Sequence, residues 1–460
     1  MFELSDYQLV SRDFLAERTF AGLFDVPGVG KTPPTIVAAA DRVADTGRPA
    51  LVTAPAYLLD NWEYEIGRFA PGAKVIKANG KGYEARQDAF ETGADFVLTS
   101  YNNWSATWPS KHPLAGQRQY EILTQKEWAA CVYDESHRLR GKDSRTTKHV
   151  WQLRLARATN LNTPIWCLSG TPIVNNPGDL YPLLHLYDKR TYSSYRRFVQ
   201  HYCYIIKTQW SEDVGQLRHG MEEEFQSLLE EFSLRRTLAD VPSLSTLEHR
   251  ERDYVVELPA SVRKSFNQAR KEYIIEHPDL EGSEFVNGGG ALYSRLRQLS
   301  TNPPTAEKPK VDFVLDFLQD RFGPVVVYVW YKDSARAVAE GLTKSKRPVT
   351  VVTGDVAPNK RTELVDKWKS AKNGILVATI SSLKEGISLI NASDVIFLEH
   401  SPLPADQEQC VARLKRRGQT EIVNVHNVFA KGTPDIAIRR SLNERNLGLK
   451  RALISWLREG

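Results

Sequence analysis

A glycine-rich loop between an expected strand and an expected helix restricts the fold more than any other feature of the sequence. The strand is expected over Ala21–Phe24, the loop DVPGVGKT occupies residues 25–32, and a helix is expected over Thr35–Ala44. In such a unit, backbone N–H groups wrap phosphate oxygens and the helix N-terminus adds positive potential. Asp25 stands where the strict phosphate-loop pattern has Gly, so the match fails by one residue. The alternative is a glycine-rich turn beside a chance lysine.

Short β-branched segments alternate with helical patterns in both halves of the chain. Strands are expected at Ala21–Phe24, Ala50–Thr53, Lys74–Ala78, Phe96–Ser100, Ala130–Tyr133, Pro164–Leu168, Val325–Val329, Val349–Val352, Ile375–Ala378, Val395–Leu398 and Ile422–Val425. Between about residues 187 and 300 the strand signals thin out, and Met221–Phe232 and Ser261–Ile275 have the apolar spacing of amphipathic helices. A closing helix is expected over Asp435–Arg458. The pattern predicts two α/β lobes with parallel sheets and mostly helical material between them.

The loop and a later strand end carry the residues expected to hydrolyse a nucleotide. Lys31 is expected to reach the β- and γ-phosphates, and the Thr32 hydroxyl to ligate Mg²⁺. The apolar run at residues 129–133 ends in Asp134 and Glu135. Asp134 is expected to hold Mg²⁺ through water, and Glu135 to orient and deprotonate the attacking water. Alone, such a carboxylate pair is usually a solvated loop; beside a phosphate loop, catalysis is the favoured interpretation.

Two further segments fit the same chemistry. The small residues Ser169, Gly170 and Thr171 follow an expected strand and suit a hydrogen-bond relay from the nucleotide to a second site, although such turns are common. Arg413 and Arg416 lie three residues apart and are expected to share one helical face, where they can meet the charge that develops on the γ-phosphate. The alternative for the arginines is a basic surface helix.

Composition limits the class of protein without naming a partner. The 460 residues carry a formal charge of +5, which permits an anionic partner but does not require one. The four cysteines form no CxxC pair, and no signal peptide or membrane-length apolar run is seen. We therefore expect no membrane association and a reducing compartment.

Taken in order, the motifs resemble those of the Swi/Snf-type ATPases of helicase superfamily 2. The matching segments are Asp6-Tyr7-Gln8, residues 51–55 with Asn61-Trp62 and Glu65, Asp134 to Leu139, SGTPIVNN at residues 169–176, Leu234-Arg235-Arg236-Thr237, and Gly418-Gln419-Thr420. The most specific is SGTPIVNN, which is close to the family's TGTPIQNN. Its two asparagines and the following residues 179–184 separate this family from other helicases.

The resemblance implies two RecA-like lobes with helical protrusions. Lobe 1 would span residues 1–240 with a protrusion at about 187–240, and lobe 2 residues 241–460 with a protrusion at about 258–305, the arginine motif and the C-terminal helix. ATP with Mg²⁺ would bind between the lobes, completed by Arg413 and Arg416. Nucleotide contacts would come from Gln8, Gly28, Val29, Gly30, Lys31, Thr32 and Gly386. Double-stranded DNA, gripped by its backbone, would be contacted by Thr53, Ser100, Tyr101 and Thr379.

The sequence also departs from the family pattern. Val26 replaces a usual Glu, and Pro33-Pro34 replaces a segment that normally carries Gln. The run from Thr379 to Leu389 lacks the usual double glycine and is nearer the branch of fork-remodelling, strand-annealing enzymes. No bromodomain or chromodomain motif is seen, so the chain resembles a compact prokaryotic or viral form of the family, for which we expect a monomer in the cytoplasm of a bacterium or of a phage-infected host. Three functions remain open: an ATP-driven double-stranded DNA translocase, a strand-separating DNA or RNA helicase, and a nucleotide-gated DNA-binding module without turnover.

Overall fold

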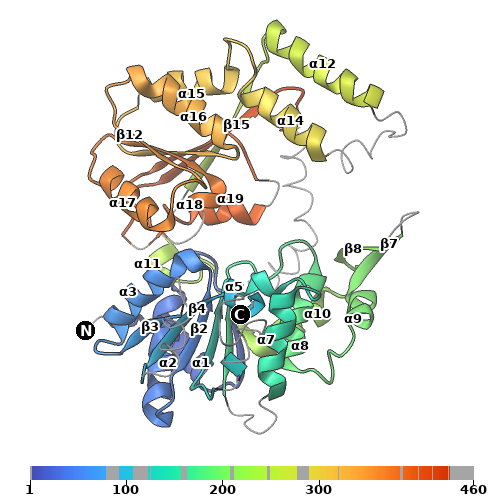
Figure 1. The fold of residues 1–460 in the computed structure, drawn as a ribbon, viewed down its shortest axis with the longest axis vertical. Helices are drawn as coiled ribbons and strands as arrows, with labels where there is room; N and C mark the ends of the chain where they lie inside the picture. Colours follow the sequence, from blue (N-terminus) through green and yellow to red (C-terminus); the bar gives the residue numbers. More distant parts are fainter. Residues whose placement is uncertain are drawn as a thin grey trace, which may run out of the picture. The chain divides into compact units, whose positions relative to one another are not determined.

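The computed structural model describes two compact units that meet in sequence between Ser243 and Leu244 (Figure 1). It describes residues 3–78, 93–106, 123–124, 126–156, 163–207, 212–245, 249–276, 290–319, 321–383, 387–401, 404–416, 418–433 and 435. Each unit is built on its own parallel sheet and is described by itself.

The sheet of unit 1 has the strand order β3-β4-β2-β5-β6-β1-β9, and every pairing in it is parallel. Its strands are β1 (Phe20–Leu23), β2 (Ala50–Ala54), β3 (Val75–Lys77), β4 (Phe96–Ser100), β5 (Cys131–Asp134), β6 (Ile165–Leu168) and β9 (Ser233–Leu234). Its helices are α1 (Asp6–Ala16), α2 (Thr32–Thr46), η1 (Ala56–Leu58), α3 (Leu59–Phe69), α5 (Tyr101–Ser105), η2 (Ser136–Leu139), α7 (Arg145–Ala156), η3 (Pro177–Leu180), α8 (Tyr181–Tyr187), α9 (Tyr195–Tyr202), α10 (Glu222–Phe232) and α11 (Pro242–Ser245), the last of which crosses the boundary. An antiparallel hairpin pairs β7 (Cys203–Lys207) with β8 (Glu212–Leu217).

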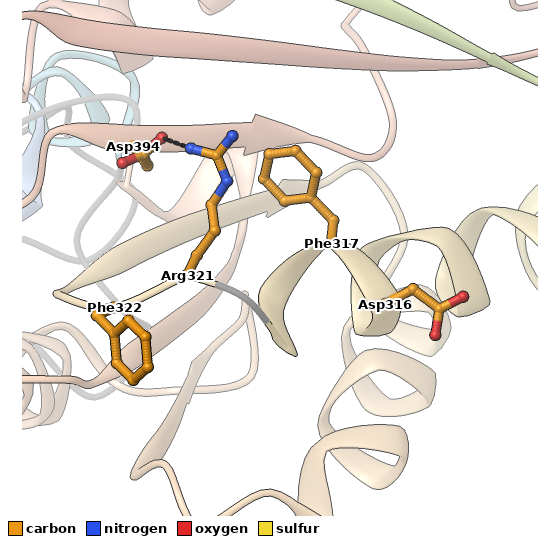
Figure 2. Close-up of a pocket in the computed structure, with 5 residues that line it drawn as sticks. All are labelled: Asp316, Phe317, Arg321, Phe322 and Asp394. Carbon is orange, nitrogen blue, oxygen red and sulfur yellow. Dashed lines mark hydrogen bonds and ion pairs between the residues drawn. The ribbon is translucent and has the colours of Figure 1, made fainter.

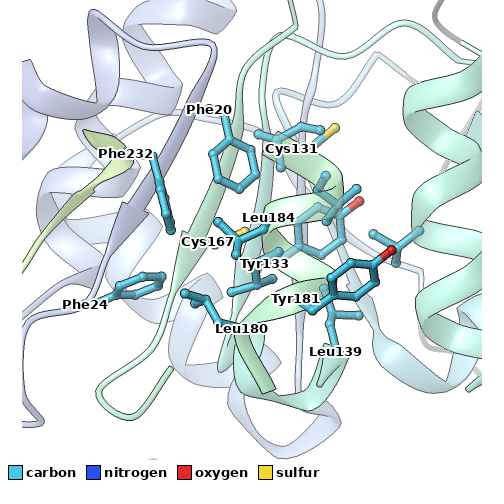
Figure 3. Packing of buried hydrophobic residues seen from close by; sticks show 14 of the residues in the cluster. Phe20, Phe24, Cys131, Tyr133, Leu139, Cys167, Leu180, Tyr181, Leu184 and Phe232 are labelled. Carbon is cyan, nitrogen blue, oxygen red and sulfur yellow. The ribbon is translucent and has the colours of Figure 1, made fainter. Parts of the chain in front are cut away.

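The first sheet is buried on both faces because successive residues of each strand enter different cores. On β5, Cys131 and Tyr133 belong to a core shared with α7, α8 and α10, while Val132 belongs to a core shared with α1, α2 and α3. Figure 3 shows the first of these cores, where Phe232 of α10 packs 5.7 Å from Phe20 between ring centroids. This two-sided burial explains why the strands read as continuous apolar runs and why their ends are held in a fixed register.

The sheet of unit 2 has the strand order β10-β15-β14-β11-β13-β12 and is also parallel throughout. Its strands are β10 (His249–Val256), β11 (Val325–Val329), β12 (Val349–Val352), β13 (Ile375–Thr379), β14 (Asp394–Phe397) and β15 (Val423–Ala430). Its helices are α12 (Ala260–Glu276), α14 (Gly290–Thr301), α15 (Pro309–Gln319), α16 (Lys332–Gly341), η4 (Leu342–Lys344), α17 (Pro358–Lys369), α18 (Ile380–Leu383) and α19 (Pro404–Val411). Cores again lie on both faces, one with α17, α18 and α19 and the other with α15 and α16.

The expected fold of two parallel-sheet lobes with helical protrusions is confirmed, and the central region, mostly helical among the described residues, also contains strands that were not expected. It contains the β7–β8 hairpin, β9 and the eight-residue edge strand β10. β10 begins His-Arg-Glu-Arg-Asp and is exposed along most of its length, so its sequence carries no apolar run that marks a strand. It forms because β15 offers a full row of backbone partners. Of the helix expected over Asp435–Arg458, all but Asp435 lies outside the described residues.

Candidate nucleotide site

Three motif-bearing strand ends lie next to one another in unit 1. Asp134 at the end of β5 is in register with Leu168 at the end of β6, and Leu168 is in register with Leu23 at the end of β1. The phosphate loop follows β1, the carboxylates end β5, and Ser169 follows β6. Because carboxyl ends of parallel strands meet at one edge of a sheet, the sheet gathers residues that are up to about 140 positions apart in sequence.

The phosphate loop has the backbone that phosphate binding requires. Gly28 and Gly30 have φ angles of 98° and 96°, a region that glycine enters freely and other residues enter at a cost. Lys31 donates from Nζ to the Asp25 carbonyl oxygen at 2.7 Å. Helix α2 starts at Thr32, so Pro33 and Pro34 fall in its first turn, where the missing N–H groups have no helical partner. The two prolines are therefore compatible with the helix entry of the loop.

An arginine from the far end of unit 1 fixes the loop. The Arg236 guanidinium pairs with the carboxylate of Asp25 at 2.7 Å, and it also donates to the Tyr7 carbonyl and the Ser11 hydroxyl. Tyr7 in turn donates from its hydroxyl to the Val29 carbonyl at 2.9 Å. Asp25 is 1% exposed, so its charge depends on this partner. The ion pair with Arg236 thus explains why Asp25 stands where the phosphate-loop pattern has Gly.

Gln8, expected to read adenine, lies beside the loop. Its Nε2 donates to the Gly30 carbonyl at 3.2 Å, and its Oε1 accepts from the Ser5 backbone N–H in a capping box at the start of α1. The structure therefore places Gln8 at the loop and with both amide ends engaged. Its role toward the base stays a prediction.

Asp134 is a buried carboxylate held by two aromatic side chains. Its Oδ2 accepts from the Trp62 indole N–H at 2.8 Å, and Tyr101 donates its hydroxyl to the Asp134 carbonyl at 2.7 Å. Burial, followed by the neighbouring charge of Glu135, raises the pKa of Asp134 to about 6. Lys31 and Trp62 act in the opposite direction on that pKa, which places the loop lysine within electrostatic reach of the carboxylate.

The backbone turns sharply at the second carboxylate. Glu135 has φ 51° and is the single non-glycine residue with positive φ among the residues that the structure describes. Such a conformation costs of order 1–3 kcal/mol and is concentrated at functional sites. It ends β5 and starts η2, which separates the directions of the Asp134 and Glu135 side chains.

The donors at this edge suit a magnesium ion. Mg²⁺ takes hard oxygen ligands and usually combines one or two protein groups with phosphate oxygens. The Thr32 hydroxyl and the Asp134 carboxylate are donors of that kind. The charge of the neighbouring Glu135 disfavours ionisation of the buried Asp134 and contributes to its raised pKa, and a cation relieves that repulsion. The residues present therefore fit the ion.

A chain of polar contacts leads from the second carboxylate to the motif after β6. His137 Nδ1 lies 3.3 Å from Glu135 Oε2 and 3.2 Å from Ser169 Oγ. Ser169 Oγ in turn accepts from the Thr171 backbone N–H at 3.1 Å. Between these two lies Gly170, where an added Cβ would stand 2.6 Å from Pro27 Cδ in the phosphate loop. The expected coupling residues are therefore connected to Glu135 through His137 and pack against the phosphate loop at Pro27.

The residues expected to contact DNA lie at strand ends but are buried. Thr53, Ser100, Tyr101 and Thr379 are 0%, 3%, 7% and 2% exposed. Trp104 donates from Nε1 to the Thr53 hydroxyl at 3.1 Å, and the Tyr101 hydroxyl donates to the Asp134 carbonyl oxygen. Their side chains therefore lie in the interior of the two units in this structure.

The expectation that Arg413 and Arg416 share a helical face is wrong. Helix α19 ends at Val411, and residues 412–416 form turns. The Leu389 backbone N–H donates to the Arg413 carbonyl at 2.8 Å, so a tertiary contact takes the oxygen that a continuing helix needs. Arg413 is 5% exposed and Arg416 is half-buried. Gly386, expected to contact nucleotide, lies outside the described residues.

Sequence reasoning missed Trp62, Tyr101 and His137 as partners of the carboxylates, and Arg236 as the partner of the loop. Trp62 and Arg236 stood inside motifs that the family resemblance had matched, so a signal was present. Their partners were not predictable, because the Trp62–Asp134 bond joins residues 72 positions apart and the Arg236–Asp25 pair joins residues 211 positions apart.

Together, the fold and this edge define a P-loop nucleotide-binding protein with two parallel-sheet units. The SNF2-related domain model matches residues 16–303, and the helicase conserved C-terminal domain model matches residues 309–418. The chain belongs to the SNF2-related family, as the motif resemblance predicted.

Relatives of this family occur in bacteria and vertebrates. The chain is 25% identical over 443 residues to a Bacillus subtilis protein designated a candidate ATP-dependent helicase/translocase, YwqA, with 91% of this chain and 45% of that protein covered. It is 26% identical over 418 residues to the Xenopus tropicalis SWI/SNF-related matrix-associated actin-dependent regulator of chromatin subfamily A-like protein 1, with 90% and 41% covered. The chain thus spans less than half the length of these relatives. The two identities are nearly equal, so the branch within the family stays a prediction.

A solved structure, the SWI2/SNF2 ATPase core of Sulfolobus solfataricus in complex with dsDNA, is 20% identical with a TM-score of 0.45, covering 99% of this chain and 95% of that chain. Within the described residues, no helix combines the length and apolar character needed to span a bilayer.

Proposed function

We propose that this chain is an ATP-driven motor that moves on double-stranded DNA. The observation that carries the ATPase part is the set of three neighbouring strand ends, which brings a phosphate loop, a carboxylate pair and a hydrogen-bond relay to one edge. Membership of the SNF2-related family and the matched helicase C-terminal domain support a motor rather than a simple hydrolase.

In the proposed reaction, Lys31 neutralises charge on the β- and γ-phosphates, while backbone N–H groups from Gly28 to Thr32 hold the phosphate oxygens. Thr32 and Asp134 would hold Mg²⁺, which would supply positive charge to offset the charge of the phosphates. Glu135 orients a water molecule and accepts its proton as the water oxygen attacks the γ-phosphorus and the bond to the β-phosphate oxygen breaks. Arg413 and Arg416 are proposed to stabilise the charge that develops on the transferring group.

His137 gives this chemistry a route to the DNA-binding part of the motor. A change in the position or charge of Glu135 alters its interaction with His137, which contacts Ser169. Ser169 holds the backbone of the SGTPIVNN segment through Thr171. We propose that this chain of contacts transmits the state of the nucleotide to the loops at the strand ends.

Contact with DNA is proposed through backbone phosphates. The formal charge of +5 is compatible with such contact, which falls with salt and shows little sequence preference. Because the side chains of Thr53, Ser100, Tyr101 and Thr379 are buried, we propose that these residues act through backbone groups and by shaping the loops that follow them.

The test is an ATPase titration with duplex, single-stranded and forked DNA and with RNA. We expect duplex DNA to stimulate hydrolysis and Lys31→Ala to abolish the stimulated rate. Stimulation by RNA without stimulation by duplex would refute the proposal. Unwinding in a strand-displacement assay without a duplex-translocation signal would favour a strand-separating helicase. Equal ATP consumption by wild type and Lys31→Ala would leave only a nucleotide-gated binding module.

A further inference from the structure

A cationic cavity lies at the amino-terminal end of the second sheet. Arg250 and Arg252 of β10 are in register with Asn424 and His426 of β15, so their side chains share one face. With Arg321, which precedes β11, these four residues line a cavity of about 120 Å³. β10, β14 and β15 begin here, whereas the nucleotide-binding motifs of this fold follow strand ends. The cavity therefore lies at the edge of its sheet where strands begin, opposite the edge where strands end.

The cavity carries uncompensated positive charge. The carboxylate of Asp394 contacts two of the lining residues: its Oδ1 lies 3.0 Å from Arg321 Nη1 and 2.8 Å from His426 Nε2. Arg250 and Arg252 are exposed, and neither forms an ion pair with any residue that the structure describes. Two arginine side chains without carboxylate partners at one small cavity make a site for an anion, and the planar guanidinium groups suit a phosphate.

A larger hollow adjoins this cavity and shares Arg321 with it. Its volume is about 480 Å³, and it is lined by Asp316, Phe317, Arg321, Phe322 and Asp394 (Figure 2). Figure 2 shows the Arg321 side chain extending beside the Phe317 ring to Asp394. The Arg321 guanidinium carbon lies 4.2 Å from the Phe317 ring centroid, so the ring fixes the arginine.

Phe322 gives this hollow an unused aromatic face. The residue is 87% exposed, more than any other large hydrophobic residue among those that the structure describes. The lining of this hollow includes the carboxylates of Asp316 and Asp394, and the cationic cavity adjoins it at Arg321. An aromatic ring close to cationic side chains is the arrangement by which proteins stack an unpaired base and hold its phosphate. Bases inside a duplex are already stacked on their neighbours, so they do not offer a free face to Phe322.

We infer that this composite surface binds a nucleotide unit of single-stranded nucleic acid, separately from the proposed ATP and duplex sites. Arg250, Arg252 and Arg321 hold a phosphate in the smaller cavity, and the base stacks on Phe322 in the larger one. The smaller cavity, of about 120 Å³, lies among three arginines and suits a phosphate group, whereas the larger, of about 480 Å³, has room for a base. The same chemistry accepts a free mononucleotide, and competition distinguishes the two sources.

The test measures binding of a fluorescein-labelled oligo(dT) by anisotropy, using the full chain without ATP and with excess unlabelled duplex to occupy the proposed motor site. The double variant Arg250→Gln/Arg252→Gln is expected to weaken binding at least about tenfold and to lower its salt dependence. Lys367→Gln/Lys372→Gln removes the same charge from exposed positions elsewhere in unit 2 and is the matched control; it is expected to bind like wild type.

A second variant separates stacking from charge. Phe322→Ala is expected to weaken binding at least about fivefold and to abolish quenching of a 2-aminopurine placed in the strand. Because Phe322 is exposed, the thermal unfolding of this variant is expected to match wild type. Competition by AMP at equal nucleotide concentration identifies a free nucleotide as the ligand, and lack of competition identifies a strand.

Three results overturn the inference. The first is equal binding by the double variant and its charge-matched control. The second is complete displacement of oligo(dT) by the duplex, which makes the motor site the only site. The third is equal displacement by a phosphopeptide and by unlabelled oligo(dT), which shows that the site recognises a phosphate without a base. None of these depends on ATP turnover, so failure here is distinguishable from failure of the proposed motor function.

Discussion

Replacing Trp62 by Phe tests whether the indole N–H positions the carboxylate that is proposed to hold Mg²⁺. The bond from Trp62 to Asp134 Oδ2 is 2.8 Å long, and both residues are buried, at 1% and 8% exposure. Phe keeps most of the apolar contact and removes only the donor and one ring. The expected effect therefore has a packing component and a hydrogen-bond component.

The two components have different sizes. A small cavity from the lost ring costs about 1 kcal/mol. A hydrogen bond to a charged group contributes about 1.5–3 kcal/mol, and its loss leaves a buried acceptor without that donor. We expect Trp62→Phe to lower the free energy of unfolding by about 2.5–4 kcal/mol. The pKa of Asp134 rises further, because the Trp62 hydrogen bond is the largest influence that lowers it.

The functional consequence is a weaker magnesium site. Second-shell partners of metal ligands typically contribute about 10–100-fold to metal affinity. At fixed saturating ATP and duplex DNA, the Mg²⁺ concentration that gives half-maximal ATPase activity is expected to rise by about that factor. Urea unfolding followed by circular dichroism gives the stability of the same preparation.

Trp166→Phe is the matched control. Trp166 belongs to the same core as Trp62 and is fully buried, but its indole N–H lies 3.5 Å from the Arg18 carbonyl and does not contact a carboxylate. It is expected to lose about 1 kcal/mol of stability and to keep the wild-type Mg²⁺ requirement. If both variants show the same Mg²⁺ requirement, the indole N–H does not position Asp134 and the reasoning is refuted.

Three other predictions follow from buried contacts. Arg236→Ala leaves the buried Asp25 carboxylate without its partner and is expected to lower the free energy of unfolding by about 3–5 kcal/mol, measured by urea unfolding. A decrease below about 1 kcal/mol would contradict this. Burial and a nearby lysine lower the pKa of His400 to about 3, so the unfolded state takes up a proton first as pH falls below about 6.5. The free energy of unfolding is expected to drop by about 2 kcal/mol from pH 7 to pH 5 through this group, and His400→Gln should flatten that part of the pH profile. Gly170→Ala forces Pro27 away and should reduce kcat/KM for ATP at least about tenfold, whereas Gly67→Ala, with open space around it, should not.

Much of the second unit, and of the sheet edge that carries the candidate nucleotide site, was predictable because apolar runs and turn residues are local features of the sequence. The strands β4, β11 and β12 lie at the predicted bounds, and the predicted bounds of β1, β2, β5, β6, β13 and β14 differ by one residue. Buried parallel strands are continuous apolar runs, and the residues that follow them are the ones that a parallel sheet brings to one edge. Lys31, Asp134 and Ser169 could therefore be assigned to one edge from their order and their flanking strands.

The sequence by itself thus determined the order of the buried strands along the chain, the phosphate loop and the identity of the carboxylate pair. The tertiary structure decided which side chains hold them: Arg236 on the loop, Trp62 on Asp134 and the edge strand β10 beside β15. The physical reason is the separation along the chain of the residues that interact. Apolar periodicity and turn residues report on neighbours along the chain, whereas an ion pair, a buried N–H donor or an edge strand depends on groups that only the folded backbone brings within bonding distance.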